Sequence, residues 1–162
     1  MSRYQLAQIN IGRLRAPVDD PMIAEFVANL DRINALADAA PGFVWRLTGA
    51  GNNATDIQPV ADDPLMALNM SVWESVAALG AFVYRSDHVG VMRRRAAWFE
   101  KLELYMALWW VPAGHRPSVA EGWGKVETLR RLGPTAEAFT FRQPFPAPDA
   151  KAAPPPVLDE CA

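Results

Sequence analysis

The sequence of residues 104–112, LYMALWWVP, decides the fold. It is a continuous apolar run, rich in aromatic residues, that ends at Pro112. Such a run predicts a β-strand. Successive side chains of a strand point to opposite faces of the sheet, so this strand needs a cover on both sides. The two alternating sets are Leu104, Met106, Leu108 and Trp110 on one face, and Tyr105, Ala107, Trp109 and Val111 on the other.

Three further strands and two helical regions are predicted before this strand. Alternation predicts strands at residues 4–12, 43–49 and 65–73. An apolar stripe over residues 22–40 predicts a helix, for which Asp19 or Asp20 is a candidate cap. Residues 74–86 and 88–103 predict a second helical region. The order β-α-β-β-α-β predicts an α+β fold of the ferredoxin-like kind, an antiparallel sheet with helices on one face.

The chain of 162 residues is long enough for one domain with its own core, and we expect that domain to span residues 1–145. It includes an extra helix over residues 119–132, capped by Ser118, and a fifth strand over residues 138–145. Six of the fourteen prolines lie after Gln143, so residues 146–162 are predicted to form a flexible, Pro-rich tail. Cys161, in this tail, is expected to be a free thiol and not a nucleophile.

The composition argues against several kinds of partner. There are 16 Lys and Arg residues against 18 Asp and Glu residues, a balance without the basic excess typical of nucleic-acid binding. No apolar run approaches the roughly 20 residues that a membrane helix needs, and the N-terminus lacks a signal-peptide pattern. We therefore expect a cytoplasmic protein that binds neither nucleic acid nor membrane. With two His and one Cys, no metal site built from protein ligands alone is expected.

The face of the predicted sheet opposite the helices carries aromatic and aliphatic side chains with a few amides. Such a surface needs a cover, and we expect a second copy of the chain to supply it. Two sheets packed face to face would make a homodimer of the α+β barrel type, with an enclosed cavity. The alternative is that the fifth strand and the tail of the same chain fold over this face.

Several phrases of the sequence resemble known families. The order of elements, the Trp that ends the third strand in SVWES and a His in the second helical region resemble the dimeric α+β barrel proteins. That superfamily includes antibiotic-biosynthesis monooxygenases and haem-degrading monooxygenases. More narrowly, SVWESVAALGAFVYRSDH, RRRAAWFEKLE, LWWVPAGHRPSVAEG and LGPTAEAFTF resemble the domain of unknown function 3291 family, over about residues 4–145. The superfamily resemblance implies a pocket between sheet and helices, whereas the family name assigns no activity.

His88 lies in the second helical region. On a continuous helix it would share a face with Arg95 and with apolar residues, so a titratable group would lie near a fixed cation. This arrangement suits an acid/base group beside an anionic substrate. Haem-degrading members of the superfamily use a helical His as iron ligand, so the resemblance offers haem ligation by His88 as an alternative. The structural alternative is a His that is hydrogen-bonded in the core or caps a helix break.

A second group of candidates lies on the strands. If the alternation holds, side chains of these residues converge: Gln8, Asn10, Arg46, Asn69, Ser71, Trp73 and Trp109. Cofactor-independent monooxygenases of the superfamily use Asn and Trp residues in an apolar pocket to oxidise electron-rich aromatic substrates. By this resemblance we expect His88, Asn69 and Trp73 to be catalytic, and Asn10, Arg46, Arg95 and Trp109 to bind substrate. The structural alternative is that the aromatic residues form an interface while the amides satisfy one another.

The favoured function is therefore a small-molecule enzyme of the monooxygenase-like type, acting on a hydrophobic or aromatic metabolite without a nucleotide cofactor. An isomerase or cyclase that uses the same pocket is an alternative. Two further alternatives are a haem-binding enzyme with His88 as axial ligand, and a non-catalytic dimeric protein that binds a ligand or serves as a scaffold.

Overall fold

A computed structural model describes residues 2–85, 88–102 and 105–157, without the side chains of Arg85 and His88. It contains a four-stranded antiparallel sheet with the strand order β2-β3-β1-β4. The protein is therefore of the α+β class, as the sequence predicted. The strands are β1 (Tyr4–Arg13), β2 (Phe43–Arg46), β3 (Met66–Trp73) and β4 (Met106–Pro112). The helices are α1 (Ala24–Asp38), α2 (Val76–Arg85), α3 (His88–Arg93), α4 (Arg95–Trp98) and α5 (Val119–Leu132).

The pairing of the strands sorts their side chains onto two faces. In β1, Gln8 lies opposite Ser71 of β3 on one side and opposite Leu108 of β4 on the other. Directly paired residues of an antiparallel sheet point to the same face, so these three side chains share one face. Ile9, one residue along, pairs with Met70 and Ala107 on the opposite face.

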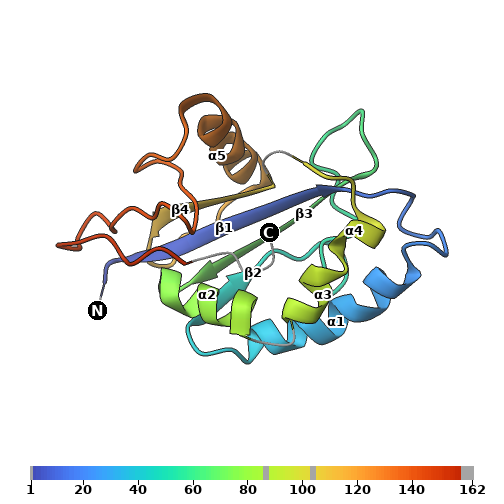
Figure 1. Cartoon of the computed structure of the whole chain (residues 1–162), viewed down its shortest axis with the longest axis horizontal. Helices are drawn as coiled ribbons and strands as arrows, with labels where there is room; N and C mark the ends of the chain where they lie inside the picture. The colour runs from blue at the N-terminus through green and yellow to red at the C-terminus, as the bar shows by residue number, and fades with distance from the viewer. Residues whose placement is uncertain (1, 86–87, 103–104, 158–162) are drawn as a thin grey trace.

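The face that carries Gln8 is covered by the four helices α1–α4, which Figure 1 shows beneath the sheet. Leu6, Trp73 and Leu108 on this face pack against Val76 and Leu79 of α2. Farther along β1, a second apolar cluster joins the sheet to the helices through Leu14, Ile23 and Trp98. Polar side chains lie in the middle of this face, between the two apolar clusters. They line the candidate site described below.

Helix α5 covers the other face, so the prediction that helices cover only one face is wrong. Val126 and Leu129 of α5 pack on Ile9, Met70 and further odd-numbered residues of β1 and β4, and Figure 1 shows α5 on the side opposite α1–α4. The apolar face that gave the reason to expect a face-to-face dimer is thus buried within the chain. The part of the chain that covers this face is α5, and not the fifth strand and tail that the alternative prediction named.

Local signals explain where α5 begins and ends. The Ser118 side chain accepts a hydrogen bond from the amide of Glu121 at 3.1 Å, the N-cap contact that the sequence predicted. Gly133 follows the helix with a φ of 69°, which is open to glycine at little cost. Helix α1 differs from the prediction, because Asp20 accepts a bond from the amide of Met22 in a preceding turn and does not cap the helix.

The second helical region is not continuous. Helix α3 ends at Arg93 and α4 begins at Arg95, with Arg94 between them. The chain becomes extended at Phe99, where an isolated bridge joins it to Leu14. The prediction of a helix over residues 88–103 is therefore wrong in its length and continuity.

The C-terminal segment lies along the edge of the sheet beside β4. Phe139 and Leu108 exchange two backbone hydrogen bonds, of 2.8 and 2.9 Å, in one isolated bridge. The predicted fifth strand is thus only a bridge. In the Pro-rich segment, Asp149 accepts hydrogen bonds from Ser2 Oγ and the amide of Arg3, and the Val157 amide donates to the carbonyl of Phe141. The predicted flexible tail therefore contacts the body up to Val157, and Cys161 lies outside the described residues.

Candidate functional site

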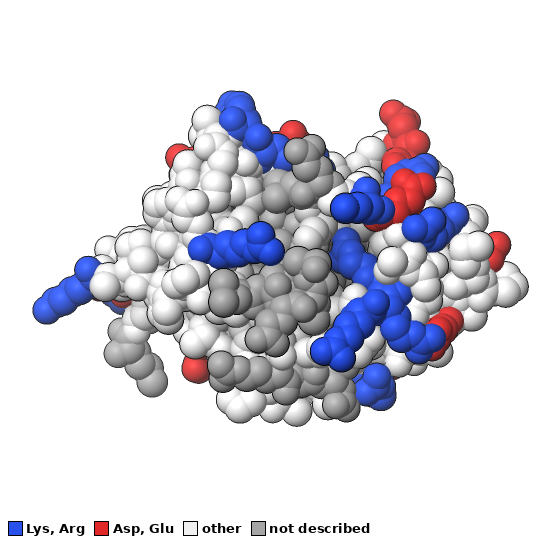
Figure 2. Space-filling model, viewed as in Figure 1, with Lys and Arg blue, Asp and Glu red and all other residues white. Residues whose placement is uncertain are grey.

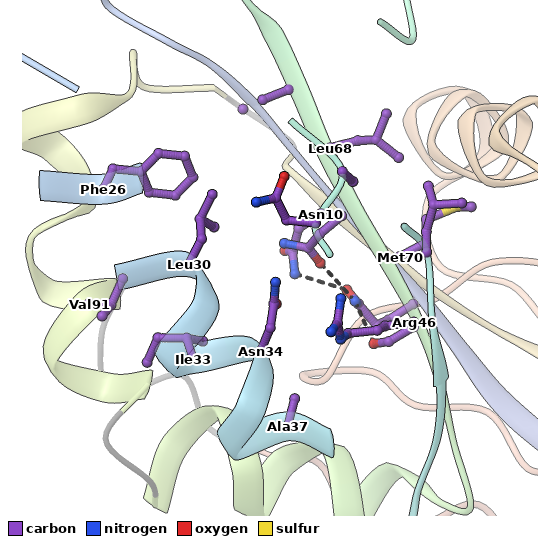
Figure 3. A pocket seen from close by; sticks show the side chains of 18 of the residues that line it. Asn10, Phe26, Leu30, Ile33, Asn34, Ala37, Arg46, Leu68, Met70 and Val91 are labelled. Carbon is purple, nitrogen blue, oxygen red and sulfur yellow. Dashed lines mark hydrogen bonds between the residues drawn. The ribbon is translucent and has the colours of Figure 1, made fainter. Parts of the chain in front are cut away.

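A cavity of about 200 Å³ lies between the polar middle of the sheet and the helices α1–α4. Figure 3 shows side chains of α1 pointing into it, with Asn10 on the sheet side. The polar side chains and the indole of the sheet that line it are Gln8, Asn10, Asn69, Ser71 and Trp73. The helices contribute mainly apolar walls, which are Phe26, Leu30, Ile33, Ala37, Leu79, Phe82, Val83, Val91, Met92 and Trp98.

Four polar side chains on the sheet form one hydrogen-bonded row. Gln8 Nε2 donates to Asn69 Oδ1 at 2.9 Å and to Ser71 Oγ at 2.8 Å. Gln8 Oε1 accepts from Asn10 Nδ2 at 2.9 Å. Gln8 is only 4 % exposed, so its three hydrogen bonds offset the cost of burying its amide. The row is therefore fixed in orientation by Gln8.

The donors of this row point toward the cavity. Ser71 Oγ accepts from Gln8 and also from the indole Nε1 of Trp73 at 2.8 Å. An indole nitrogen is only a donor, so the hydroxyl hydrogen of Ser71 is left for another acceptor. Asn69 uses its oxygen for Gln8, which leaves its Nδ2 hydrogens available, and Asn69 is exposed at the cavity. A ligand oxygen beside Asn69 and Ser71 would therefore meet donors.

Arg46 lines the cavity but is already engaged. Its guanidinium forms a fork with Asp38, with distances of 2.8 and 3.2 Å. It also donates to the backbone oxygen and to the side chain of Asn52. Arg46 therefore ties α1 to the loop that follows β2, whose residues 53–55 line the cavity. Arg46 still lines the cavity, and its role in substrate binding stays a prediction.

Arg95 is the second guanidinium of the cavity, and its partners among the described residues are uncharged. It donates from Nη2 to the carbonyl oxygen of Ile11 at 3.1 Å. Its Cζ lies 4.6 Å from the ring centre of Tyr105 and 5.3 Å from that of Phe99, within cation–π range. Burial lowers the pKa of Arg95, and the nearby Tyr105 opposes that effect. Guanidinium stays protonated in proteins, so a positive charge remains here.

The structure brings together most of the predicted site residues. Five of them line the cavity: Asn10, Arg46, Asn69, Trp73 and Arg95. Val91, Met92 and Phe99, which are apolar residues of the region predicted as the second helical one, also line the cavity. The side chain of His88, the predicted catalytic group, lies outside the described residues.

Trp109 does not join this group, contrary to the prediction. It pairs with Ala7 and so points to the face covered by α5, where it is 1 % exposed. Its indole Nε1 donates to Glu121 Oε1 at 3.1 Å, and Glu121 Oε2 contacts His115 Nε2 at 2.7 Å. Trp109 and His115 therefore fix α5 on the sheet.

Sequence reasoning missed two polar residues of the helical wall, Asn29 and Asn34. In Figure 3, Asn34 projects from α1 toward the sheet, where Asn10 and Arg46 lie. It follows Leu30 by four residues, so both share a helix face that is otherwise apolar. A polar residue inside an apolar stripe was the available signal.

Three absences hold for the described part of the chain. None of the cavity-lining residues described here is an Asp, Glu, His, Cys, Lys or Tyr. Across residues 2–85, 88–102 and 105–157, no group of three or more His, Cys, Asp or Glu is placed to hold a metal ion. A search of those same residues also finds no helix with the length and hydropathy to cross a membrane.

The chain is an α+β protein. One face of its sheet is covered by α5, and polar side chains of the other face line a small pocket. The family model described as "Domain of unknown function (DUF3291)" matches residues 5–154. The chain therefore belongs to this family, as its sequence phrases predicted. No curated protein matches the chain. Among solved structures it is similar to a protein of unknown function from Nitrosomonas europaea, 15 % identical with a TM-score of 0.47, over 72 % of this chain and 97 % of that one.

Proposed function

We propose that the cavity binds a small hydrophobic or aromatic metabolite and that the protein is a monooxygenase-like enzyme needing no nucleotide cofactor. The observation that carries the proposal is the cavity itself, which combines apolar helical walls with a fixed row of donors. Apolar walls with a few placed polar groups are typical of small-molecule sites. The volume of about 200 Å³ is below the roughly 300–1,000 Å³ of sites for drug-sized ligands, so a compact ligand fits best.

The chemistry would be stabilisation of negative charge on an electron-rich substrate. In such a reaction the substrate gives electrons to O₂, so that a ring CH₂ becomes C=O and the second oxygen atom leaves as water. Asn69 Nδ2 and the Ser71 hydroxyl are donors for the substrate oxygen that carries the developing charge. Trp73 contributes an apolar surface and holds Ser71 in place.

A non-catalytic binding role is the second candidate, and one observation favours it. The described lining residues include no carboxylate, imidazole or thiol that would take a proton from a substrate. A monooxygenase substrate would therefore have to be acidic enough to bind as its anion. Isomerases and cyclases that need a protein base find less support for the same reason. Haem, the remaining alternative, is a poor match in size to a cavity of this volume.

The ferredoxin-like arrangement of the fold and the homodimer are also part of this proposal. The strand order β2-β3-β1-β4 with antiparallel neighbours is compatible with the ferredoxin-like arrangement. A homodimer remains a prediction, but the apolar sheet face that motivated it is occupied by α5. A second copy would have to use another surface.

An oxygen-electrode assay tests the enzymatic part. With 9-anthrone as probe, we expect the protein to accelerate O₂ uptake, with one anthraquinone and one water formed per O₂. Asn69→Ala should lower turnover by about tenfold or more, because one positioned donor in a dry site contributes on the order of 10²–10³ in rate. Trp73→Phe should also lower turnover, because it removes the indole N–H that holds Ser71, the second donor, in place. Calorimetry should show that both variants still bind the probe.

Trp123→Phe is the matched control, since Trp123 packs on the α5 side of the sheet and not in the cavity. It should keep full turnover. Uptake of O₂ equal to that of the protein-free solution would refute the oxidation, and retained anthrone binding would then support the binding role.

A further inference from the structure

The cavity contains one positive charge that the described part of the chain does not neutralise. Arg46 is paired with Asp38. Arg95 contacts a carbonyl oxygen and two aromatic rings, and no carboxylate of the described residues lies within ion-pair distance of it. A charge removed from water is costly unless it is paired, so this guanidinium favours an anion beside it.

The position of Arg95 fits one end of a ligand. It bonds to the carbonyl of Ile11, next to Asn10 in β1. From there the polar row runs along the sheet through Asn10 and Gln8 to Trp73, which pairs with Leu6. A ligand lying along β1 would therefore have its charged group at Arg95 and its apolar body against the helical walls.

We propose that the ligand is a compact aromatic or alicyclic carboxylate, with its carboxylate on Arg95; this rests on the proposed function of the cavity. A guanidinium presents two parallel N–H donors that match a carboxylate. A phosphorylated ligand fits less well, because the described walls offer only this one unpaired cation and are otherwise mainly apolar.

The surface around the site is consistent with an anionic ligand. Figure 2 shows Lys and Arg side chains gathered over the part of the molecule where Figure 1 places α3 and α4. Arg93 and Arg94 of this segment are exposed. Positive charges near a cavity raise the local concentration of an anion and speed its association. The basic residues thus assist entry, while Arg95 binds.

Calorimetric titration with matched probes tests this inference. The probes are benzoate and 2-naphthoate, each compared with its neutral amide, benzamide or 2-naphthamide. We expect at least one carboxylate to bind about tenfold or more tightly than its amide, the size of one charge-assisted hydrogen bond. Arg95→Gln should abolish this preference and leave amide binding unchanged.

Arg131→Gln is the control for net charge, since Arg131 is exposed on α5 and does not line the cavity. It should keep the preference. Arg95→Lys retains the charge and a donor to Ile11, so it serves if Arg95→Gln does not fold, and it should keep a reduced preference.

The outcomes separate the two proposals. Equal binding of a carboxylate and its amide by the natural protein, or a preference that survives Arg95→Gln, would overturn the carboxylate proposal while the cavity keeps its role. Binding of none of the four probes at millimolar concentration would overturn both.

Discussion

At Gly122 the helix α5 approaches the sheet closely. A Cβ atom at this position would collide with Met70 Sδ and lie 3.0 Å from Ile9 Cδ1. Both partners are buried in the core between α5 and the sheet, where they have little room to move. Gly124, two residues along the same helix, has open space at the same atom. The two glycines therefore differ only in what surrounds them.

Replacing each glycine by alanine tests this contact. Alanine favours a helix over glycine by roughly 1 kcal/mol, so Gly124→Ala should raise the free energy of unfolding by up to about that amount. Gly122→Ala should lower it relative to Gly124→Ala by about 1–3 kcal/mol, the usual cost of overpacking. Urea unfolding measures both. Equal stability of the two variants would show that α5 does not pack here as described.

At the scale of elements, α5 is held by a side chain at its first turn. Glu121 accepts from the buried indole of Trp109 and contacts His115 in the preceding turn. Glu127, farther along α5, forms only an exposed pair with Arg130 at 2.8 Å. One helix thus contains two glutamates in very different environments.

Glu121→Ala should destabilise the protein by about 1–3 kcal/mol, because it leaves the buried indole N–H of Trp109 without an acceptor. Glu127→Ala should change stability by about 0.5 kcal/mol or less, as for other exposed pairs. Thermal or urea unfolding of both variants gives the comparison. A loss from Glu127→Ala as large as that from Glu121→Ala would contradict the assigned anchor.

The sequence predicted the cores of all four strands, because alternation and apolar runs mark them. It did not predict the register of one strand against its neighbour. Trp109 was grouped with Gln8, but the pairing of Gln8 with Leu108 turns Trp109 to the opposite face. A shift of one residue between strands reverses every side chain, and only the paired structure fixes that choice.

Helix ends were predictable only where a residue marks them. Ser118 and Gly133 frame α5 as expected. The break at Arg94 has neither a Gly or Pro nor a side-chain cap to mark it. The sequence predicted part of the cavity lining, because Asn10, Asn69 and Trp73 lie on strands that could be recognised. The pairing of Arg46 with Asp38 depends on α1 lying beside β2, which local sequence does not encode.

At the scale of the molecule, the Pro-rich C-terminal segment contacts the N-terminal end of the described chain. Asp149 accepts from the amide of Arg3 and the hydroxyl of Ser2, which joins the Pro-rich segment to the start of β1. The hydrogen bond from the Arg3 amide is the main cause that lowers the pKa of Asp149; a weaker desolvation effect opposes it, and the bond from Ser2 lowers the pKa further. The ionised carboxylate therefore favours the folded state.

A depressed carboxyl pKa has a defined consequence for acid stability. The contribution of Asp149 should be complete above the ordinary Asp pKa of about 3.9 and be lost as the pH falls through the lower folded value. Asp149→Asn should thus lower the melting temperature at pH 7, and this difference should shrink toward pH 3. Asp62→Asn, at an exposed carboxylate, is the control. A difference independent of pH would exclude the ionised group as its cause.

The alternation of β1 and β3 also bears on how this protein can change over evolutionary time. Positions such as Gln8 and Asn69 that face the cavity alternate with positions such as Ile9 that pack beneath α5. Substitutions in the first set would alter the lining of the cavity, while the second set continues to hold the fold. The lining can therefore change through a few point substitutions, without a compensating change beneath α5.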